Sequence, residues 1–197
     1  MEKPCPIGGA FRSIMFVEKM PTDFEKSISS LALKLVAAHW LAARRGRETP
    51  GWAALMPTAI KAQLPIVWSY IYDSDSDLFT GRLAGERVTG LFGNDFRGRP
   101  MSEAHPKDHY PVLFAKCKKA LTEPALYHGS GLIFIASEKY ARGERIIMPL
   151  SSDGITGDGI FGATDIPSFA RDEIPEMNFD SEIGRWFSPS GGALSGL

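Results

Sequence analysis

The sequence predicts an α+β fold, with a five-stranded antiparallel sheet, helices on one face, and an N-terminal amphipathic helix on or beside the other. Three observations lead to this prediction. Apolar residues recur every three or four positions near the N-terminus, which indicates the first helix, and a second such segment lies in the middle of the chain. Five strand-like runs flank this middle region, two before it and three after it.

Composition limits the classes of function. The 197 residues suffice for one domain with its own core, and 44% hydrophobic with 23% charged residues is typical of a globular protein. A net charge of −1 with scattered basic residues argues against nucleic acid and membrane surfaces as partners. We find no secretory signal, no membrane-spanning run and only two distant cysteines, so we expect a cytoplasmic protein.

The first helix is the strongest local signal. We expect an N-terminal arm over residues 1–21, this helix over 22–46, the main domain over 47–165 and a C-terminal tail over 166–197. Thr22 and Glu25 match a capping box at the start of the helix, and Gly46 suits its end. The spacing predicts one apolar face made of Phe24, Ile28, Leu31, Leu35, Ala38 and Leu41.

The main domain is predicted to open with a β-hairpin. The run IVWSYIY (66–72) is β-branched and aromatic, and LFTGRLA (78–84) follows it after the polar turn DSDSD. The first run is apolar on both faces, so it needs cover on both sides of the sheet. Short helical turns and loops should follow, then a helix within 107–124. The last three strands are predicted within 125–137, 144–152 and 157–164.

Motifs for common chemistry are missing. The segment DLFTGRLAGERVTGLFGNDFRGRP (77–100) is rich in glycine and arginine, but contains neither a P-loop nor a dinucleotide-binding pattern. His105 and His109 are four residues apart, yet Pro106 lies between them and no H-E-x-x-H pattern occurs. We therefore predict no catalytic residue and no metal ligand, and we expect that the protein is not an enzyme.

Arg82, inside the second predicted strand, allows two interpretations. A salt bridge to Asp95 or Glu144 would make it a buried anchor between the strand and a neighbouring segment. Alternatively, its guanidinium faces a ligand and recognises a carboxylate or a phosphate.

Several short strings, taken in order, resemble the PAS family over roughly residues 35–163. They are His39-Trp40 with Arg44-Arg45-Gly46, then Pro50, Pro57 and Ile60, GRLAG (81–85), GNDFRG (93–98), and ERIIMPL (144–150) with SSDG (151–154). The pattern is most similar to the short single-domain PAS-like proteins of alphaproteobacteria. It departs from them at Glu86, where the family has a small hydroxyl residue.

The resemblance implies a sensory or signalling module with a small-ligand pocket between its sheet and a helix. Family members hold haem, flavin, a metabolite or no identified molecule there. The flavin-adduct class uses a cysteine in an N-C-R-F-L-Q-type motif, and GNDFRG has none, so we expect no flavin adduct. His109 precedes the helix that would flank the pocket and could ligate haem, but a solvent-facing histidine near a helix start is the commoner case, so we do not expect haem either. The cofactor stays unknown. The candidate pocket residues are Trp68, Tyr70, Arg82, Phe92, Phe96, Leu113, Phe114, Cys117, Phe134 and Met148.

Two further functions remain open beside the ligand-binding sensor. The candidate pocket residues could instead fill the space between the sheet and the helix completely. The protein would then be a ligand-free interaction or dimerisation scaffold. A small enzyme ranks third, because no nucleophile or metal pattern supports it. The partners implied are an unidentified small molecule, a signalling protein and a possible homodimer through residues 22–46.

Overall fold

The computed structural model describes residues 20–92, 95–107, 109–135, 139–167 and 182–194, without the side chains of residues 91–92, 134–135 and 139–141. The helical elements are α1 (Asp23–Ser27), α2 (Leu31–Ala43), η1 (Trp52–Ala54), η2 (Pro57–Ile66), α3 (Glu86–Phe92), α4 (Met101–Ala104) and α5 (Tyr110–Thr122). The strands are β1 (Val67–Asp73), β2 (Leu78–Ala84), β3 (Leu126–Ile135), β4 (Lys139–Leu150), β5 (Gly159–Asp165) and β6 (Glu182–Phe187).

These strands form one antiparallel sheet in the order β2-β1-β5-β4-β3-β6. The predicted α+β class is confirmed, but the sheet has six strands rather than five. The additional strand, β6, comes from the segment predicted to be a tail, and it pairs Phe187 with Leu126 of β3. Phe187 is buried, and its ring lies 5.3 Å from that of Phe24, so this short strand is held by the core as well as by β3.

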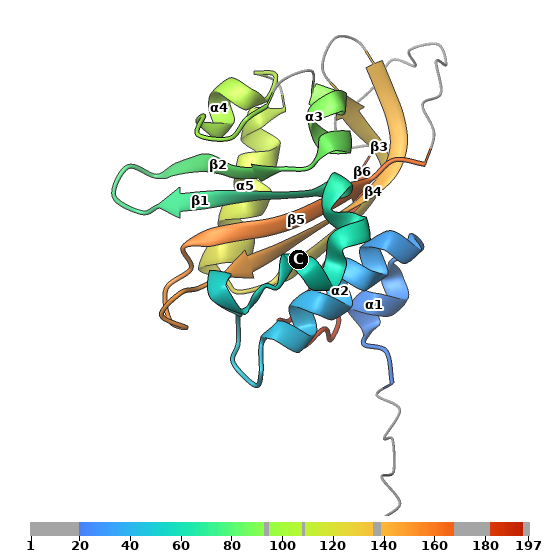
Figure 1. Cartoon of the computed structure of the whole chain (residues 1–197), viewed down its shortest axis with the longest axis vertical. Coiled ribbons are helices and arrows are strands. Elements are labelled where there is room, and N and C mark those ends of the chain that lie inside the picture. The colour runs from blue at the N-terminus through green and yellow to red at the C-terminus, as the bar shows by residue number, and fades with distance from the viewer. Residues whose placement is uncertain (1–19, 93–94, 108, 136–138, 168–181, 195–197) are drawn as a thin grey trace, which may run out of the picture.

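Helices cover both faces of the sheet. In Figure 1, α1 and α2 lie in front of the sheet and α5 lies behind it. Side chains alternate along a strand, so neighbouring residues of β4 enter different cores. Ile146 and Met148 pack with α1 and α2, whereas Ile147 packs with α5. The run IVWSYIY is apolar on both faces and therefore predicts that both faces of the sheet are covered. The structure has helices packed on each face.

The N-terminal helix differs from the prediction because it is broken into α1 and α2. The capping box is present: the Thr22 backbone N–H donates to Glu25 at 2.8 Å. The chain then leaves the helix, and the Glu144 carboxylate of β4 accepts hydrogen bonds from the backbone N–H groups of Ser29 (3.0 Å) and Ser30 (2.9 Å). Ser30 in turn caps α2 by accepting from the Leu33 N–H. A charged acceptor on the sheet thus stabilises a second helix start.

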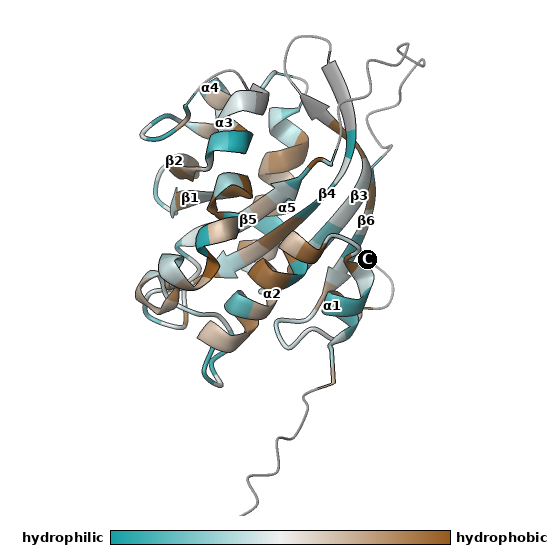
Figure 2. Cartoon of the chain, turned by 45° about the vertical axis from the view of Figure 1, so that its right-hand side comes forward, coloured by the Kyte–Doolittle hydropathy of each residue, from teal (hydrophilic) through white to brown (hydrophobic). Residues whose placement is uncertain are grey.

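The break changes which face of the helix is buried. The residues of α2 that face the sheet are Leu33, Val36, Ala37, Trp40 and Leu41. Trp40 also donates its indole N–H to the Pro149 carbonyl at 3.0 Å. Leu31, Leu35 and Ala38, predicted to share the buried face with Phe24 and Ile28, are exposed instead. In Figure 2 the α2 ribbon is largely brown, since this helix is apolar on both sides.

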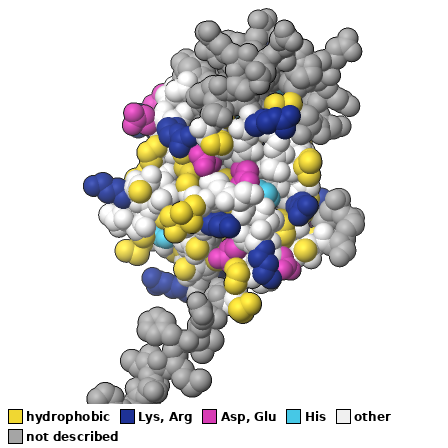
Figure 3. Space-filling model, turned by 90° about the vertical axis from the view of Figure 1, so that its right-hand side faces the viewer, with side chains coloured by type: hydrophobic (Ala, Val, Ile, Leu, Met, Phe, Trp, Pro, Cys, Tyr) yellow, Lys and Arg dark blue, Asp and Glu magenta, His cyan; other side chains and the backbone are white. Residues whose placement is uncertain are grey.

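No single charge dominates the face of the molecule that Figure 3 shows. On the face seen in Figure 3, hydrophobic side chains are interspersed with side chains of both charges, in keeping with the net charge of −1. Among the described residues, no helix is both long enough and apolar enough to cross a membrane.

Candidate functional site

A small cavity lies between the sheet and the helices α3 and α5. Its volume is about 20 Å³, which is room for about one water molecule. The lining residues are Trp68, Tyr70, Val88, Phe96, His105, Leu113, Arg145 and Thr164. Side chains therefore fill most of the space between sheet and helix, and the remaining volume borders polar and charged groups.

Tyr70 and Phe96 form the aromatic wall of the cavity. Their rings stack, with centroids 5.0 Å apart and planes 8° from parallel. Phe96 belongs to the segment after α3, which docks on β2 at Gly81. The Gly81 N–H donates to the Arg99 carbonyl at 2.9 Å, and the Gly98 N–H donates to the Gly81 carbonyl at 2.7 Å. The described part of GNDFRG (95–98) thus lies beside the first residue of GRLAG.

Glycine is required at position 81 because the two backbones approach closely there. A Cβ atom at Gly81 would lie 2.0 Å from the Phe96 carbonyl oxygen, far inside contact distance. A side chain at this position would push the docked segment away from β2. The aromatic wall depends on this contact, because the same segment carries Phe96.

Two buried hydrogen bonds fix the polar groups of the wall. The Tyr70 hydroxyl and His105 Nε2 lie 2.8 Å apart, and Trp68 Nε1 donates to Thr164 Oγ1 at 2.9 Å. Burial, with smaller contributions from Arg145 and His109, lowers the pKa of His105 to about 3. Burial also raises the pKa of Tyr70. Both partners of the Tyr70–His105 hydrogen bond are therefore neutral near neutral pH.

A partly buried charge cluster borders the cavity. Glu182 of β6 lies between two cations, with Lys116 Nζ at 2.6 Å from one carboxylate oxygen and Arg145 Nε at 3.2 Å from the other. Burial raises the pKa of Glu182, but Arg145 and Lys116 more than offset this, so the net shift is downward. Burial also lowers the pKa of Lys116. The described part of this cluster contains two cations and one carboxylate, and the guanidinium of Arg145 borders the cavity.

The structure brings together only part of the predicted pocket. Trp68, Tyr70, Phe96 and Leu113 line the cavity, while Phe114 and Cys117 pack in the same core without lining it. Cys117 is fully buried, and burial raises the pKa of its thiol to about 12, so it is not a reactive thiolate. The side chains of Phe92 and Phe134 lie outside the described residues.

Met148 and Arg82 lie elsewhere than predicted. Met148 belongs to the core under α2, because its strand parity places it on the other face of the sheet from the cavity. Arg82 is exposed rather than buried, and its guanidinium stacks over the Trp52 ring at 4.3 Å. The two suggested partners are used elsewhere: Asp95 pairs with Arg97, and Glu144 caps α2. The predicted anchoring salt bridge of Arg82 is wrong.

Sequence reasoning missed four lining residues: Val88, His105, Arg145 and Thr164. Strand periodicity could have indicated Arg145, which lies two residues before Ile147 and so shares its face. His105 had no such signal, because it follows the short helix α4 and reaches Tyr70 only through the tertiary fold.

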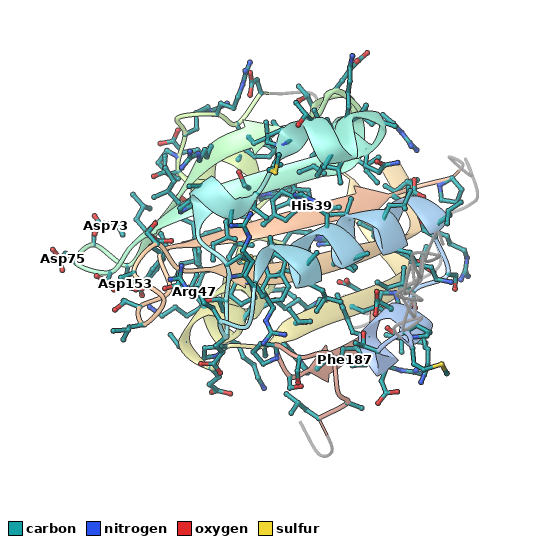
Figure 4. All side chains as sticks on the ribbon, turned by 60° about the horizontal axis from the view of Figure 1, so that its bottom comes forward. His39, Arg47, Asp73, Asp75, Asp153 and Phe187 are labelled. Atoms are coloured by element: carbon teal, nitrogen blue, oxygen red, sulfur yellow. The ribbon has the colours of Figure 1, made fainter. Side chains whose placement is uncertain are left out.

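The acidic residues of the β1–β2 turn and of the turn before β5 do not gather into a metal site. Asp73 and Asp75 lie at the tip of the β1–β2 hairpin (Figure 4), where Asp73 accepts hydrogen bonds from the Asp75 N–H and the Ser76 hydroxyl. Asp153, in the turn before β5, accepts from the backbone N–H groups of Ile155 and Thr156, which lower its pKa to about 2. No group of three or more potential ligands that could hold a metal occurs in the described ranges.

The buried histidine leads to a prediction about pH. An unfolded His105 takes up a proton near its ordinary pKa of 6.5, whereas the folded residue resists protonation down to about 3. Unfolding therefore becomes easier as the pH falls from 6.5 towards 3, by up to about 1.4 kcal/mol per pH unit from this group. Urea denaturation of wild type and His105→Gln at several pH values should show this slope only in the wild type. Equal slopes in both proteins between pH 6.5 and about 5 would contradict the prediction.

Comparison with known proteins gives one match. A family model described as a PAS domain matches residues 28–165, which spans the sheet strands β1–β5, both helical layers and the cavity. No curated protein and no solved structure matches the chain.

Proposed function

The chain belongs to the PAS domain family and is thus a sensory or signalling module in general terms, and from this premise we propose that it senses a small anionic ligand beside Arg145. One observation carries the proposal: a charged side chain from the central sheet borders a cavity between the sheet and α5. Core positions of a sheet rarely carry arginine unless the guanidinium has a partner. The change on binding is passed on through contacts with another protein chain.

Electrostatics supports an anion as the ligand. Lys116 and Arg145 share the single carboxylate of Glu182 within the described cluster. An excess positive charge in a partly buried site is costly, and an anion in the cavity would reduce that cost. His105 and Tyr70 add neutral hydrogen-bonding groups at the same cavity. The cavity as it stands has room for about one water molecule, so an anion of several heavy atoms would require the Phe96 wall to move.

Thermal unfolding with a series of sodium salts tests this proposal. We expect chloride, nitrate, formate or acetate, at constant ionic strength, to raise the melting temperature of the wild type. A ligand at a hundredfold excess over its Kd would raise it by about 5–10 °C. Arg145→Gln should lose this response. Arg99→Gln is the matched control, because Arg99 is a surface residue paired with Glu103 at 3.7 Å and should keep it.

Native mass spectrometry of the purified protein adds a second readout, a retained small molecule. A flat response to every anion, with no retained molecule, would overturn the ligand proposal. The second candidate, a ligand-free interaction scaffold, would then be preferred. The limited cavity volume of about 20 Å³ and the exposed apolar face of α2 are the observations that favour it.

A further inference from the structure

The strand β6 occupies the edge of β3, where it contacts both α5 and α1. It pairs antiparallel with residues 126–131 of β3, and no other strand of the described chain pairs with it. The family match ends at residue 165, so β3 is the edge strand of the matched part and β6 is an addition to that edge. We call the surface that β6 covers the β3 docking site. It consists of β3 together with Phe24, Lys116, Lys119 and Arg145.

The first anchor of β6 is the Glu182 carboxylate, which lies between Lys116 and Arg145. The Glu182 side chain is 10% exposed, that of Lys116 20% and that of Arg145 14%. Gly129 of β3 makes room for the carboxylate, because a Cβ atom there would lie 2.0 Å from Glu182 Oε1. Without an acidic residue at this position, two cations would remain in a site that is largely shielded from water, which is costly. The site therefore favours a segment that carries a carboxylate.

Two aromatic rings anchor the other end of β6. Trp186 packs on Tyr127 of β3 with ring centroids 4.9 Å apart, and Lys119 Nζ lies 5.0 Å from the Trp186 ring. Phe187 points to the opposite face of the sheet, where it is buried against Phe24 of α1 (Figure 4). The residues at positions 183 and 185, between these anchors, are exposed. Only the two ends of the strand therefore select particular side chains.

Gly184 separates the acidic anchor from the aromatic pair. A Cβ atom at this position would lie 2.5 Å from the Tyr127 hydroxyl oxygen, so a side chain here would displace the Tyr127 ring. The pattern that fits the site is thus an acidic residue, a free position, glycine, a second free position and two aromatic residues. In the binding of a strand to a sheet edge, main-chain hydrogen bonds supply affinity and alternate side chains supply specificity.

We infer that the β3 docking site binds an extended segment of another protein that has this pattern, and that β6 is its built-in occupant. The contacts that hold β6 are ones that any segment of this pattern makes. Residues 166–181 join β6 to β5, a link long enough for β6 to leave while β5 stays in the sheet. The edge also extends beyond β6, because residues 132–135 of β3 pair with β4 and with no described residue of β6.

A second copy of this chain is the less favourable partner. Its β6 would make the same contacts as the tethered β6, which acts at an effective concentration of about 1 mM. The tethered strand is therefore bound preferentially below that concentration. A partner segment displaces it by binding more tightly, and pairing with residues 132–135 as well would provide the additional contacts. As the route of signal output the site rests on the proposed function, but its occupation is measured without any anion.

Fluorescence anisotropy tests the site on the full chain. The probe is a peptide of residues 182–194, acetylated at its N-terminus and labelled at its C-terminus. It should bind the wild type weakly, because the tethered β6 competes with it. The Glu182→Gln chain should bind it at least tenfold more tightly, since its own strand no longer supplies the carboxylate. A strand with only a structural role would show a loss of stability and no gain in peptide binding.

Matched variants locate the effect at the docking site. Ile183→Thr changes an exposed residue of β6, and this chain should bind the peptide as the wild type does. A peptide with glutamine in place of Glu182 should lose the tenfold gain. Lys116→Gln, added to the Glu182→Gln chain, should weaken binding at least tenfold. Lys118→Gln on the same helix should not, because Lys118 pairs with Asp77 instead. Circular dichroism will show that each variant is folded.

Hydrogen exchange of the wild type gives a readout that needs no variant. The amides of β6 should exchange through an opening that requires less free energy than global unfolding. They should therefore exchange faster than the amides of β5, which lies inside the sheet. Exchange of β6 at the same rate as β5 would show that the strand leaves only when the whole domain unfolds, and would overturn the inference.

Three binding results would also count against it. Equal affinity of the wild type and Glu182→Gln for the peptide, or no binding at a chain concentration of about 500 µM, would overturn the docking site. The wild type should sediment as a monomer at this concentration. A dimer that the free peptide dissociates would assign the site to a second copy rather than to another protein. None of these results depends on the anion response, so the docking site and the proposed ligand can fail separately.

Discussion

Gly81→Ala should lower the free energy of unfolding by about 3 kcal/mol or more, one of the two largest effects that we expect. The added Cβ would lie 2.0 Å from the Phe96 carbonyl oxygen and 2.7 Å from the Phe96 ring. The obstructing atoms include backbone, which cannot rotate away, so the segment from Phe96 to Arg99 must separate from β2. For a domain of this size the melting temperature should fall by about 6–12 °C, measured by circular dichroism.

Gly90→Ala is the matched control for this substitution. Gly90 lies in α3, and a Cβ there meets nothing within 4 Å. Alanine is the better helix former by about 1 kcal/mol, so this variant should be as stable as the wild type or more stable. If Gly81→Ala cost no more stability than Gly90→Ala does, the docked segment would not lie against β2 as the structure shows. In that case the docked segment could not be what holds the Phe96 ring against Tyr70.

Phe187→Ala should also destabilise the protein strongly, by about 3 kcal/mol or more. Phe187 is buried between Phe24 of α1 and the sheet, and its strand closes the edge next to β3. Removing the ring would leave a cavity and would weaken the contact between α1 and the sheet. Urea denaturation should show the loss as a lower midpoint with an unchanged slope.

Ile183→Ala in the same strand provides the comparison. Ile183 is 68% exposed, so its substitution should change the free energy of unfolding by only about 0.5 kcal/mol. A negligible effect of Phe187→Ala would show that residues 182–187 behave in solution as the tail that the sequence suggests. A strong effect would show that this segment belongs to the folded domain.

The aromatic core and most of the elements could be predicted from the sequence alone because their signals are local. The run IVWSYIY has the composition of a strand with two covered faces, and the structure places covers on both. The capping box of Thr22 and Glu25 starts α1 where expected. The sequence predicts four of the lining residues, because large apolar side chains occur in the segments that the PAS resemblance places around the pocket. These four residues are Trp68, Tyr70, Phe96 and Leu113.

The remaining features depend on contacts between distant segments, which no local pattern records. Glu144 breaks the N-terminal helix from 115 residues away in the sequence, and this break leaves Leu31 and Leu35 exposed. Arg145 and Glu182 meet only because β6 pairs with β3 beside β4. The sequence by itself determined which residues are apolar and where most helices and strands lie, since periodicity and propensity act over a few residues. Only the tertiary structure decided which faces are buried and which charges border the cavity, because strand order and helix docking bring those groups together.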